Sequence, residues 1–333
     1  MVYKVGLLRI FYEDADRSSW DGTNPRPLLT DVWYPAVDTA VEVDVSIGPP
    51  NTPFFNAGKS ARDAEFVIAP ASFPLVLLSH GTGGASLQLG WLAWHLASEG
   101  YIVAGINHHG NNLLEPYTAQ GFTHYWERPR DLTAVLNQLL VDPLVGARID
   151  PDRIGAGGFS LGGYTMMAIA GAVTKLQLLI EKSGRDLSKE IPEFLDPAAL
   201  AEEIKSLDSY TAAADASYRD PRVRCIFAIA PALGEAFSPE GLSPIRIPVK
   251  IVVGDADRSA PATANASYFA EHIKGAELTI LEKVAHYTFL AEATEAGKRE
   301  LPLFCLDPPG VSRVSIHRTV ATWAKEFFEK HLK

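Results

Sequence analysis

Short runs of apolar residues alternate with amphipathic segments along most of the chain. Residues 75–78 are the first such run, and the segment that follows, 87–98, repeats its apolar positions with the period of a helix. A strand covered by helices on both faces is apolar along its whole length, so such runs are typical of parallel strands. The alternation predicts βαβ units and an α/β fold with a mostly parallel central sheet flanked by helices. The runs interpreted as strands are residues 75–78, 101–105, 153–157, 225–230 and 249–253.

The two ends of the chain depart from this alternation. Residues 3–12 and 28–34 have the pattern of two strands, and the polar, turn-rich stretch 13–27 between them predicts an antiparallel hairpin at the edge of the sheet. Near the other end, apolar positions return at helical spacing, which predicts a closing helix with one face in the core. These positions are Ile316, Val320, Trp323 and Phe327.

Residues 173–220 interrupt the alternation with two or three helical patterns where a short connection would be enough. We expect a single domain over residues 1–333, with 173–220 as a helical insertion inside it. Open α/β sheets bind their ligands at the carboxyl ends of the strands, so an insertion at that edge is expected to cap a pocket. A peripheral helical decoration is the alternative interpretation.

The charge balance limits the expected partners. The 333 residues include 30 basic and 40 acidic side chains, a formal net charge of −10, and no basic block that would follow a phosphate backbone. Nucleic acid is therefore not an expected partner. The chain has neither the apolar core of a signal peptide nor an apolar stretch of roughly 20 residues, which predicts a cytoplasmic protein without a membrane span. A chain from which an export signal had been removed would give the same pattern.

Two cysteines, Cys225 and Cys305, allow at most one disulfide. Cys225 lies inside an apolar run, which favours a buried and unreactive thiol. The sequence leaves open whether the two residues pair.

The strongest chemical signal is a G-x-S-x-G motif at residues 158–162, with Ser160 at its centre. The motif follows a predicted strand and precedes a helical pattern, and in this context it forms a tight turn that exposes a nucleophilic serine. The N-terminus of the following helix would favour negative charge that develops near Ser160. A chance Gly/Ser turn without function is the alternative.

A serine hydroxyl needs a base to take its proton and a carboxylate to orient that base. His286 follows the strand-like residues 278–281. Asp255 and Asp257 follow another predicted strand, and the order Ser, Asp, His along the chain is that of the α/β-hydrolases. Position favours His286 as the base and Asp257 as its partner, with Asp255 as the alternative.

Acyl transfer also needs hydrogen-bond donors for the oxyanion. The glycine-rich residues 79–84 follow the strand 75–78, so their main-chain N–H groups can face the same pocket as the turn at Ser160. The backbone N–H groups of Thr82 and Leu161 are the expected donors. A phosphate-binding loop is the alternative, but this segment lacks the lysine and the spacing of a P-loop and does not match G-x-G-x-x-G.

Histidines and aromatic residues follow the strand 101–105 and are expected at the rim of the pocket. The candidates for substrate contact are His80, His108, His109 and Trp126. No metal is expected, because the spacing of His108, His109, Glu115 and His124 fits no compact ligand motif. A largely hydrophobic pocket is predicted from the aromatic residues Tyr117, Phe122, Tyr125 and Trp126.

With these motifs in place, the chain resembles the α/β-hydrolase superfamily, and within it the dienelactone hydrolase-like proteins and the related platelet-activating factor acetylhydrolases. The resemblance covers most of the chain and is carried by residues 33–35, 80–83, 108–111, 128–131, 158–163, 230–232, 254–261 and 285–290. It implies an α/β-hydrolase fold, a Ser-His-Asp triad, an oxyanion hole after the 80–81 turn and after the nucleophile, and no cofactor. Its G-x-x-D-x-x-x-P pattern, matched by Gly254, Asp257 and Pro261, implies Asp257 as the carboxylate.

One residue departs from part of this resemblance. Dienelactone hydrolases use a cysteine nucleophile, whereas position 160 is serine, so dienelactone is not the expected substrate. We expect a serine esterase that cleaves an ester, thioester or lactone of a small to medium hydrophobic substrate through an acyl-enzyme. The alternatives are an amidase or peptidase with the same triad, and a non-catalytic ligand-binding protein on the same scaffold.

Overall fold

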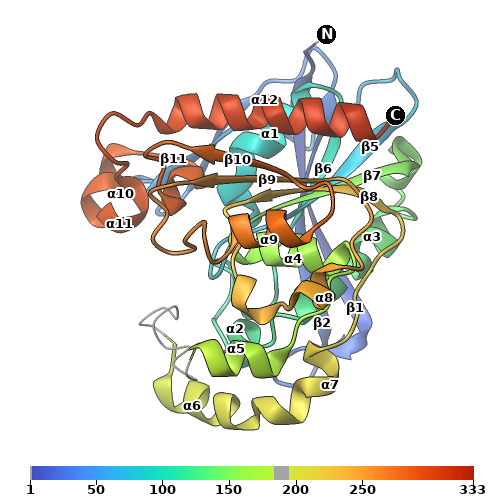
Figure 1. Ribbon diagram of the computed structural model, residues 1–333. Coiled ribbons are helices and arrows are strands. Elements are labelled where there is room, and N and C mark those ends of the chain that lie inside the picture. Colours follow the sequence, from blue (N-terminus) through green and yellow to red (C-terminus); the bar gives the residue numbers. More distant parts are fainter. Residues whose placement is uncertain (1, 184–194) are drawn as a thin grey trace.

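The computed structural model describes residues 2–183 and 195–333. Within these residues, eleven strands form one sheet in the order β10-β9-β8-β7-β5-β6-β2-β1-β4-β11, with β3 paired to β4 (Figure 1). The strands are β1 Lys4–Ser18, β2 Pro25–Ala36, β3 Val43–Ile47, β4 Phe55–Arg62, β5 Phe73–Ser79, β6 Ile102–Ile106, β7 Ile149–Phe159, β8 Val223–Ile229, β9 Val249–Gly254, β10 Glu277–Leu281 and β11 Glu292–Ala293.

Strands β5 to β10 pair with one another in parallel. Strands β5 to β9 each contain one of the short apolar runs, and Leu75, Val76 and Leu77 of β5 are completely buried between the helical layers. Because the strands are parallel, their carboxyl ends lie along one edge of the sheet. The predicted α/β class with a mostly parallel sheet is confirmed.

The predicted N-terminal hairpin forms, but its limits and its place in the sheet differ from the prediction. Strands β1 and β2 are antiparallel and continue through much of the stretch that was expected to be a turn. The hairpin is not at the edge, since β2 pairs with β6, and β1 pairs with β4, beyond which lie β3 and β11. The apolar pattern did not predict β4, because Asn56, Lys59 and Ser60 interrupt its apolar positions.

Helices cover both faces of the parallel strands. Helix α12 (Arg313–His331) lies with α1 (Gly90–Ser98) on one face, and α3 (Glu127–Leu139), α4 (Leu161–Ile169) and α9 (Ala266–His272) lie on the other (Figure 1). The shorter elements are η1 Ser86–Leu89, α2 Ala119–Thr123, η2 Gly146–Arg148, η5 Gly234–Ala236, α8 Pro239–Leu242, η6 His286–Phe289, α10 Glu295–Glu300 and α11 Pro302–Cys305.

The closing helix α12 has the predicted apolar stripe. Val320 and Phe327 are buried, and Ile316 and Trp323 pack against the core while partly exposed. Among the helices that the structure describes, none is both long enough and apolar enough to cross a bilayer.

Between α4 and β8, the described residues form α5 (Leu176–Ser183), α6 (Pro197–Ser206), η4 (Leu207–Tyr210) and α7 (Thr211–Ala214). These elements lie together on the side of the molecule opposite α12, next to α2 (Figure 1). Leu200 and Leu207 of these elements are buried. Residues 184–194 of the predicted insertion lie outside the described residues.

Candidate active site

Ser160 occupies the sharp turn between β7 and α4. Its φ of 56° and ψ of −118° are unusual for a residue with a β-carbon, a conformation that costs about 1–3 kcal/mol. Glycine is required on both sides of this turn, because a β-carbon at Gly162 would collide with the main-chain oxygen of Ser79, and one at Gly158 with that of Gly162. The turn therefore holds the serine hydroxyl at the carboxyl edge of the sheet.

Three side chains from separate strand ends meet at this edge. The hydroxyl of Ser160 lies 2.9 Å from Nε2 of His286, and Nδ1 of His286 lies 2.6 Å from Oδ2 of Asp257. Asp257 follows β9 and His286 begins η6, just after β10. The carboxylate favours the tautomer in which Nδ1–H donates to Asp257 and Nε2 accepts from Ser160.

The two aspartates of the loop after β9 have different roles. Asp257 is buried, and its Oδ1 accepts hydrogen bonds from the N–H groups of Ser259 and Ala260, at 3.0 and 2.7 Å, so the carboxylate is held in one orientation. Asp255 is exposed and accepts a hydrogen bond from the N–H of Lys283 at 2.6 Å. The structure thus brings Asp257, and not Asp255, to the histidine.

The two predicted oxyanion donors lie on opposite sides of the nucleophile turn. Thr82 follows β5, Leu161 is the first residue of α4, and both line the same cavity. Within the described residues, neither backbone N–H donates a hydrogen bond. The next N–H in the loop is already used, because Gly83 donates to Oδ1 of Asn111 at 2.5 Å. Two free donors therefore remain for an oxyanion.

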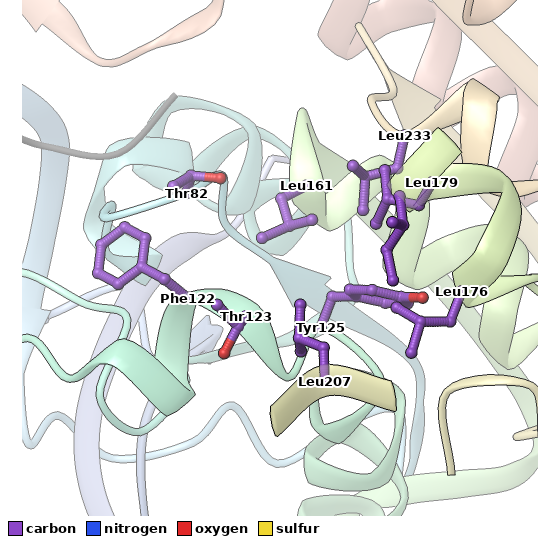
Figure 2. A pocket seen from close by; sticks show the side chains of 10 residues that line it. Thr82, Phe122, Thr123, Tyr125, Leu161, Leu176, Leu179, Leu207 and Leu233 are labelled. Carbon is purple, nitrogen blue, oxygen red and sulfur yellow. The ribbon is translucent and has the colours of Figure 1, made fainter. Parts of the chain in front are cut away.

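A cavity of about 60 Å³ lies beside these donors (Figure 2). Its walls come from the body of the protein and from α5 and η4, and most of its lining is apolar. Phe122 and Tyr125 are on the wall, as predicted, but Tyr117 and Trp126 are not. The lining residues are Thr82, Phe122, Thr123, Tyr125, Leu161, Leu176, Leu179, Ile180, Leu207 and Leu233.

None of the four residues predicted to contact substrate lines this cavity. His109 bonds to Glu115 at 3.0 Å and stacks on Trp20, while Trp126 is buried against His124. The sequence places all four candidates near the ends of strands or loops, but it does not reveal toward which side of the backbone each side chain points. The side chains that it missed include Leu176, Leu179 and Ile180, whose helical spacing was the available signal.

His80 and His108 are buried, hydrogen-bonded side chains. His80 Nδ1–H donates to the oxygen of Gly81 at 2.7 Å, and its Nε2 accepts from the N–H of His108 at 3.2 Å. Burial, reinforced by the nearby Arg128 guanidinium, lowers the pKa of His108 to about 3 and that of His80 well below its usual value. Neither histidine is poised to exchange protons with a substrate.

The remaining candidates for metal or redox chemistry are accounted for. Across the described residues, no group of three His, Cys, Asp or Glu side chains is placed to hold a metal ion. His124 bonds instead to Glu203 of α6 at 2.7 Å. Cys225 and Cys305 are free thiols, both buried, and burial raises the pKa of Cys225 to about 12.

Comparison with known proteins finds similar chains of related fold. The family model of platelet-activating factor acetylhydrolase, isoform II, matches residues 56–128. A bis(hydroxyethyl) terephthalate hydrolase from Streptomyces coelicolor is 29% identical over 150 residues, which are 45% of this chain and 44% of that protein. The aligned part thus spans less than half of that relative. A ferulic acid esterase from Streptomyces cinnamoneus superposes with a TM-score of 0.66 over 99% of this chain and 89% of its own, at 19% identity.

The chain has the fold of the α/β-hydrolases, as predicted. Over residues 56–128 it is similar to the platelet-activating factor acetylhydrolases, as its motifs predicted. The relatives in this comparison are ester hydrolases by name.

Proposed function

We propose that this chain is a serine hydrolase of carboxylic esters, with Ser160, His286 and Asp257 as its catalytic triad. The observation that carries the proposal is the hydrogen-bonded series from the Ser160 hydroxyl through His286 to Asp257, at 2.9 and 2.6 Å, next to two free N–H groups. The named activities of the relatives support the same reaction class.

In the proposed mechanism, Ser160 Oγ attacks the ester carbonyl carbon while its proton passes to Nε2 of His286. The carbonyl oxygen becomes an oxyanion, which accepts hydrogen bonds from the N–H groups of Thr82 and Leu161. The tetrahedral intermediate then expels the alcohol, which takes the proton from His286. Water attacks the resulting acyl-enzyme by the same route in reverse, and the carboxylic acid leaves. No cofactor takes part in these steps.

The expected substrate is an ester with a small or medium hydrophobic acyl group. A cavity of about 60 Å³ with leucine, isoleucine and phenylalanine walls favours an acyl group of a few heavy atoms over a long or charged one. Because α5 and η4 contribute part of this wall, we assign residues 173–220 the role of a cap over the acyl site. Thioesters and lactones of similar size fit the same chemistry.

A fluorophosphonate probe tests the activated serine directly. We expect peptide mass spectrometry to find the adduct on Ser160, and the His286→Ala variant to label at least 100-fold more slowly, because the base that takes the serine proton is gone. His272→Ala is the matched control, since this histidine lies on α9 and bonds to the oxygen of Tyr268. Labelling of the folded protein at another residue, or equal labelling without His286, would contradict the proposal. No labelling at all would favour a ligand-binding protein on this scaffold.

A further inference from the structure

The guanidinium of Arg128 is fully buried beneath the predicted oxyanion hole. Its Nη2 donates to the main-chain oxygen of His80 and lies 3.4 Å from the hydroxyl of Ser79. Both partners belong to the end of β5 and the loop that carries Thr82. Arg128 therefore holds the segment that provides one of the two free N–H groups.

The same guanidinium reaches the segment that provides the other group. Its Nε donates to the hydroxyl of Thr165 at 3.3 Å, and this hydroxyl donates to the main-chain oxygen of Leu161 at 3.0 Å. Leu161 opens α4 and carries the second free N–H. One buried side chain thus connects the two segments that provide the proposed oxyanion donors.

The electrostatic cost of this arrangement is high. Burial lowers the pKa of Arg128 to about 9, against the opposing effect of Asp131. Asp131 is itself shared, with its oxygens 2.8 Å from Arg26, 2.8 Å from Arg17 and 2.9 Å from His108. Nη1 of Arg128 is buried and has no hydrogen-bond partner among the described residues. An apolar side chain would fill this space at lower cost if packing were the only requirement.

We propose that Arg128 is a positioning residue for the reaction, which sets the distance and orientation of the Thr82 and Leu161 N–H groups and adds a buried positive charge behind the oxyanion. The inference rests on the proposed ester hydrolysis. It differs from a structural role because the hydrogen bonds hold the carbonyls of His80 and Leu161, each next to the peptide group that carries a proposed oxyanion donor. Those donors interact more strongly as negative charge develops on the carbonyl oxygen of the substrate.

The test compares an oxoester with the matching thionoester, in which sulfur replaces the carbonyl oxygen. Sulfur is a weak hydrogen-bond acceptor, so the thionoester gains less from the oxyanion donors. In Arg128→Met, we expect kcat for the oxoester to fall on the order of 100-fold with KM within about twofold, as when an oxyanion donor is lost. The thionoester rate is expected to fall much less, so the ratio of the two rates drops about tenfold or more. Thr165→Val, which keeps the guanidinium, is expected to shift the ratio in the same direction by a smaller factor.

Controls separate this inference from the function on which it rests. Arg148→Met removes an arginine that donates to the main-chain oxygens of Val67, Ile68 and Ala71, away from the site, and should leave the ratio unchanged. If folded Arg128→Met loses rate equally on both esters, so that the ratio of the oxoester rate to the thionoester rate is unchanged, the inference is overturned. If Arg128→Met does not fold, the test rests on Thr165→Val, and an unchanged ratio of oxoester to thionoester rates in that variant overturns the inference. Wild-type turnover in Ser160→Ala would overturn the proposed hydrolysis, and the positioning role with it.

Discussion

At the scale of single residues, the turn at Ser160 stores backbone strain. Its φ of 56° and ψ of −118° suit glycine better than any residue with a β-carbon, and the helix and strand on either side hold the conformation in place. The strain keeps the hydroxyl within reach of His286 and away from the sheet. The strained backbone at Ser160 therefore lowers the free energy of unfolding.

Replacing Ser160 with glycine should remove this strain. We expect Ser160→Gly to be inactive and to raise the free energy of unfolding by about 1 kcal/mol, the strain relieved less the extra entropy of glycine in the unfolded chain. Urea unfolding followed by circular dichroism measures the difference. Ser160→Ala is the control, because it also loses activity but keeps the β-carbon and should show no comparable gain. A glycine variant less stable than the alanine variant would refute the account.

At the scale of elements, strands β5 to β9 were predictable because they are largely buried and each is marked by an apolar run, whereas β10 is partly exposed. The proposed triad followed from this pattern for Ser160 and Asp257, which come just after β7 and β9, and from the strand-like residues 278–281 for His286. Strands β3, β4 and β11 were not predictable in the same way, because β3 and β11 are short and largely exposed and β4 mixes polar with apolar positions.

The wall of the cavity was the least predictable part of the site. His108 and Phe122 are both near the sheet edge, yet one bonds inward to Asp131 and the other faces the cavity. That choice depends on the direction of each side chain after folding, and local sequence does not encode it. The hydrogen bonds of Arg128 were not predictable either, because its partners, Thr165 of α4 and His80 just after β5, are distant in the sequence.

Helical element η4 offers a direct test of the cap. Leu207 is buried and lines the cavity, so Leu207→Ala should enlarge the space for the acyl group. We expect kcat/KM for p-nitrophenyl hexanoate relative to the acetate to rise about tenfold, the scale of a few methylene groups in an apolar pocket. Leu200→Ala on α6 removes a similarly buried leucine that is not on the wall. Leu200→Ala should lower the stability without changing the preference for hexanoate over acetate. An equal change of that preference in both variants would argue against the role of the cap.

At the scale of the whole molecule, buried neutral histidines connect distant elements. His317 of α12 donates from Nε2 to the main-chain oxygen of Thr288 at 2.9 Å and stacks on Trp91 of α1 at 4.2 Å between ring centroids. Thr288 belongs to η6, the element that carries His286. Burial lowers the pKa of His317 to about 3, so the closing helix and the catalytic histidine are joined by a group that must stay uncharged.

This network predicts sensitivity to acid. Between pH about 6.5 and about 3, the unfolded chain binds protons at His317, His108 and His80 that the folded protein does not bind. The free energy of unfolding should therefore decrease as the pH falls through this window, with each histidine contributing at most about 1.4 kcal/mol per pH unit. Denaturant unfolding at pH 7, 6 and 5 measures the slope, and His317→Gln should make it shallower. An equal slope in the variant would show that His317 contributes nothing to the acid response.

The proposed triad is assembled from residues that are far apart in the chain but follow the ends of β7, β9 and β10, with β8 between the first two. The site therefore has no local precursor: no continuous stretch of the polypeptide holds its chemistry before these strands are in register. During synthesis, Ser160 emerges well before Asp257 and His286, so the proposed triad is complete only after β9 and β10 have joined the sheet. If the proposed triad is catalytic, activity requires that the C-terminal half of the chain has folded, so turnover can be used to measure completed folding.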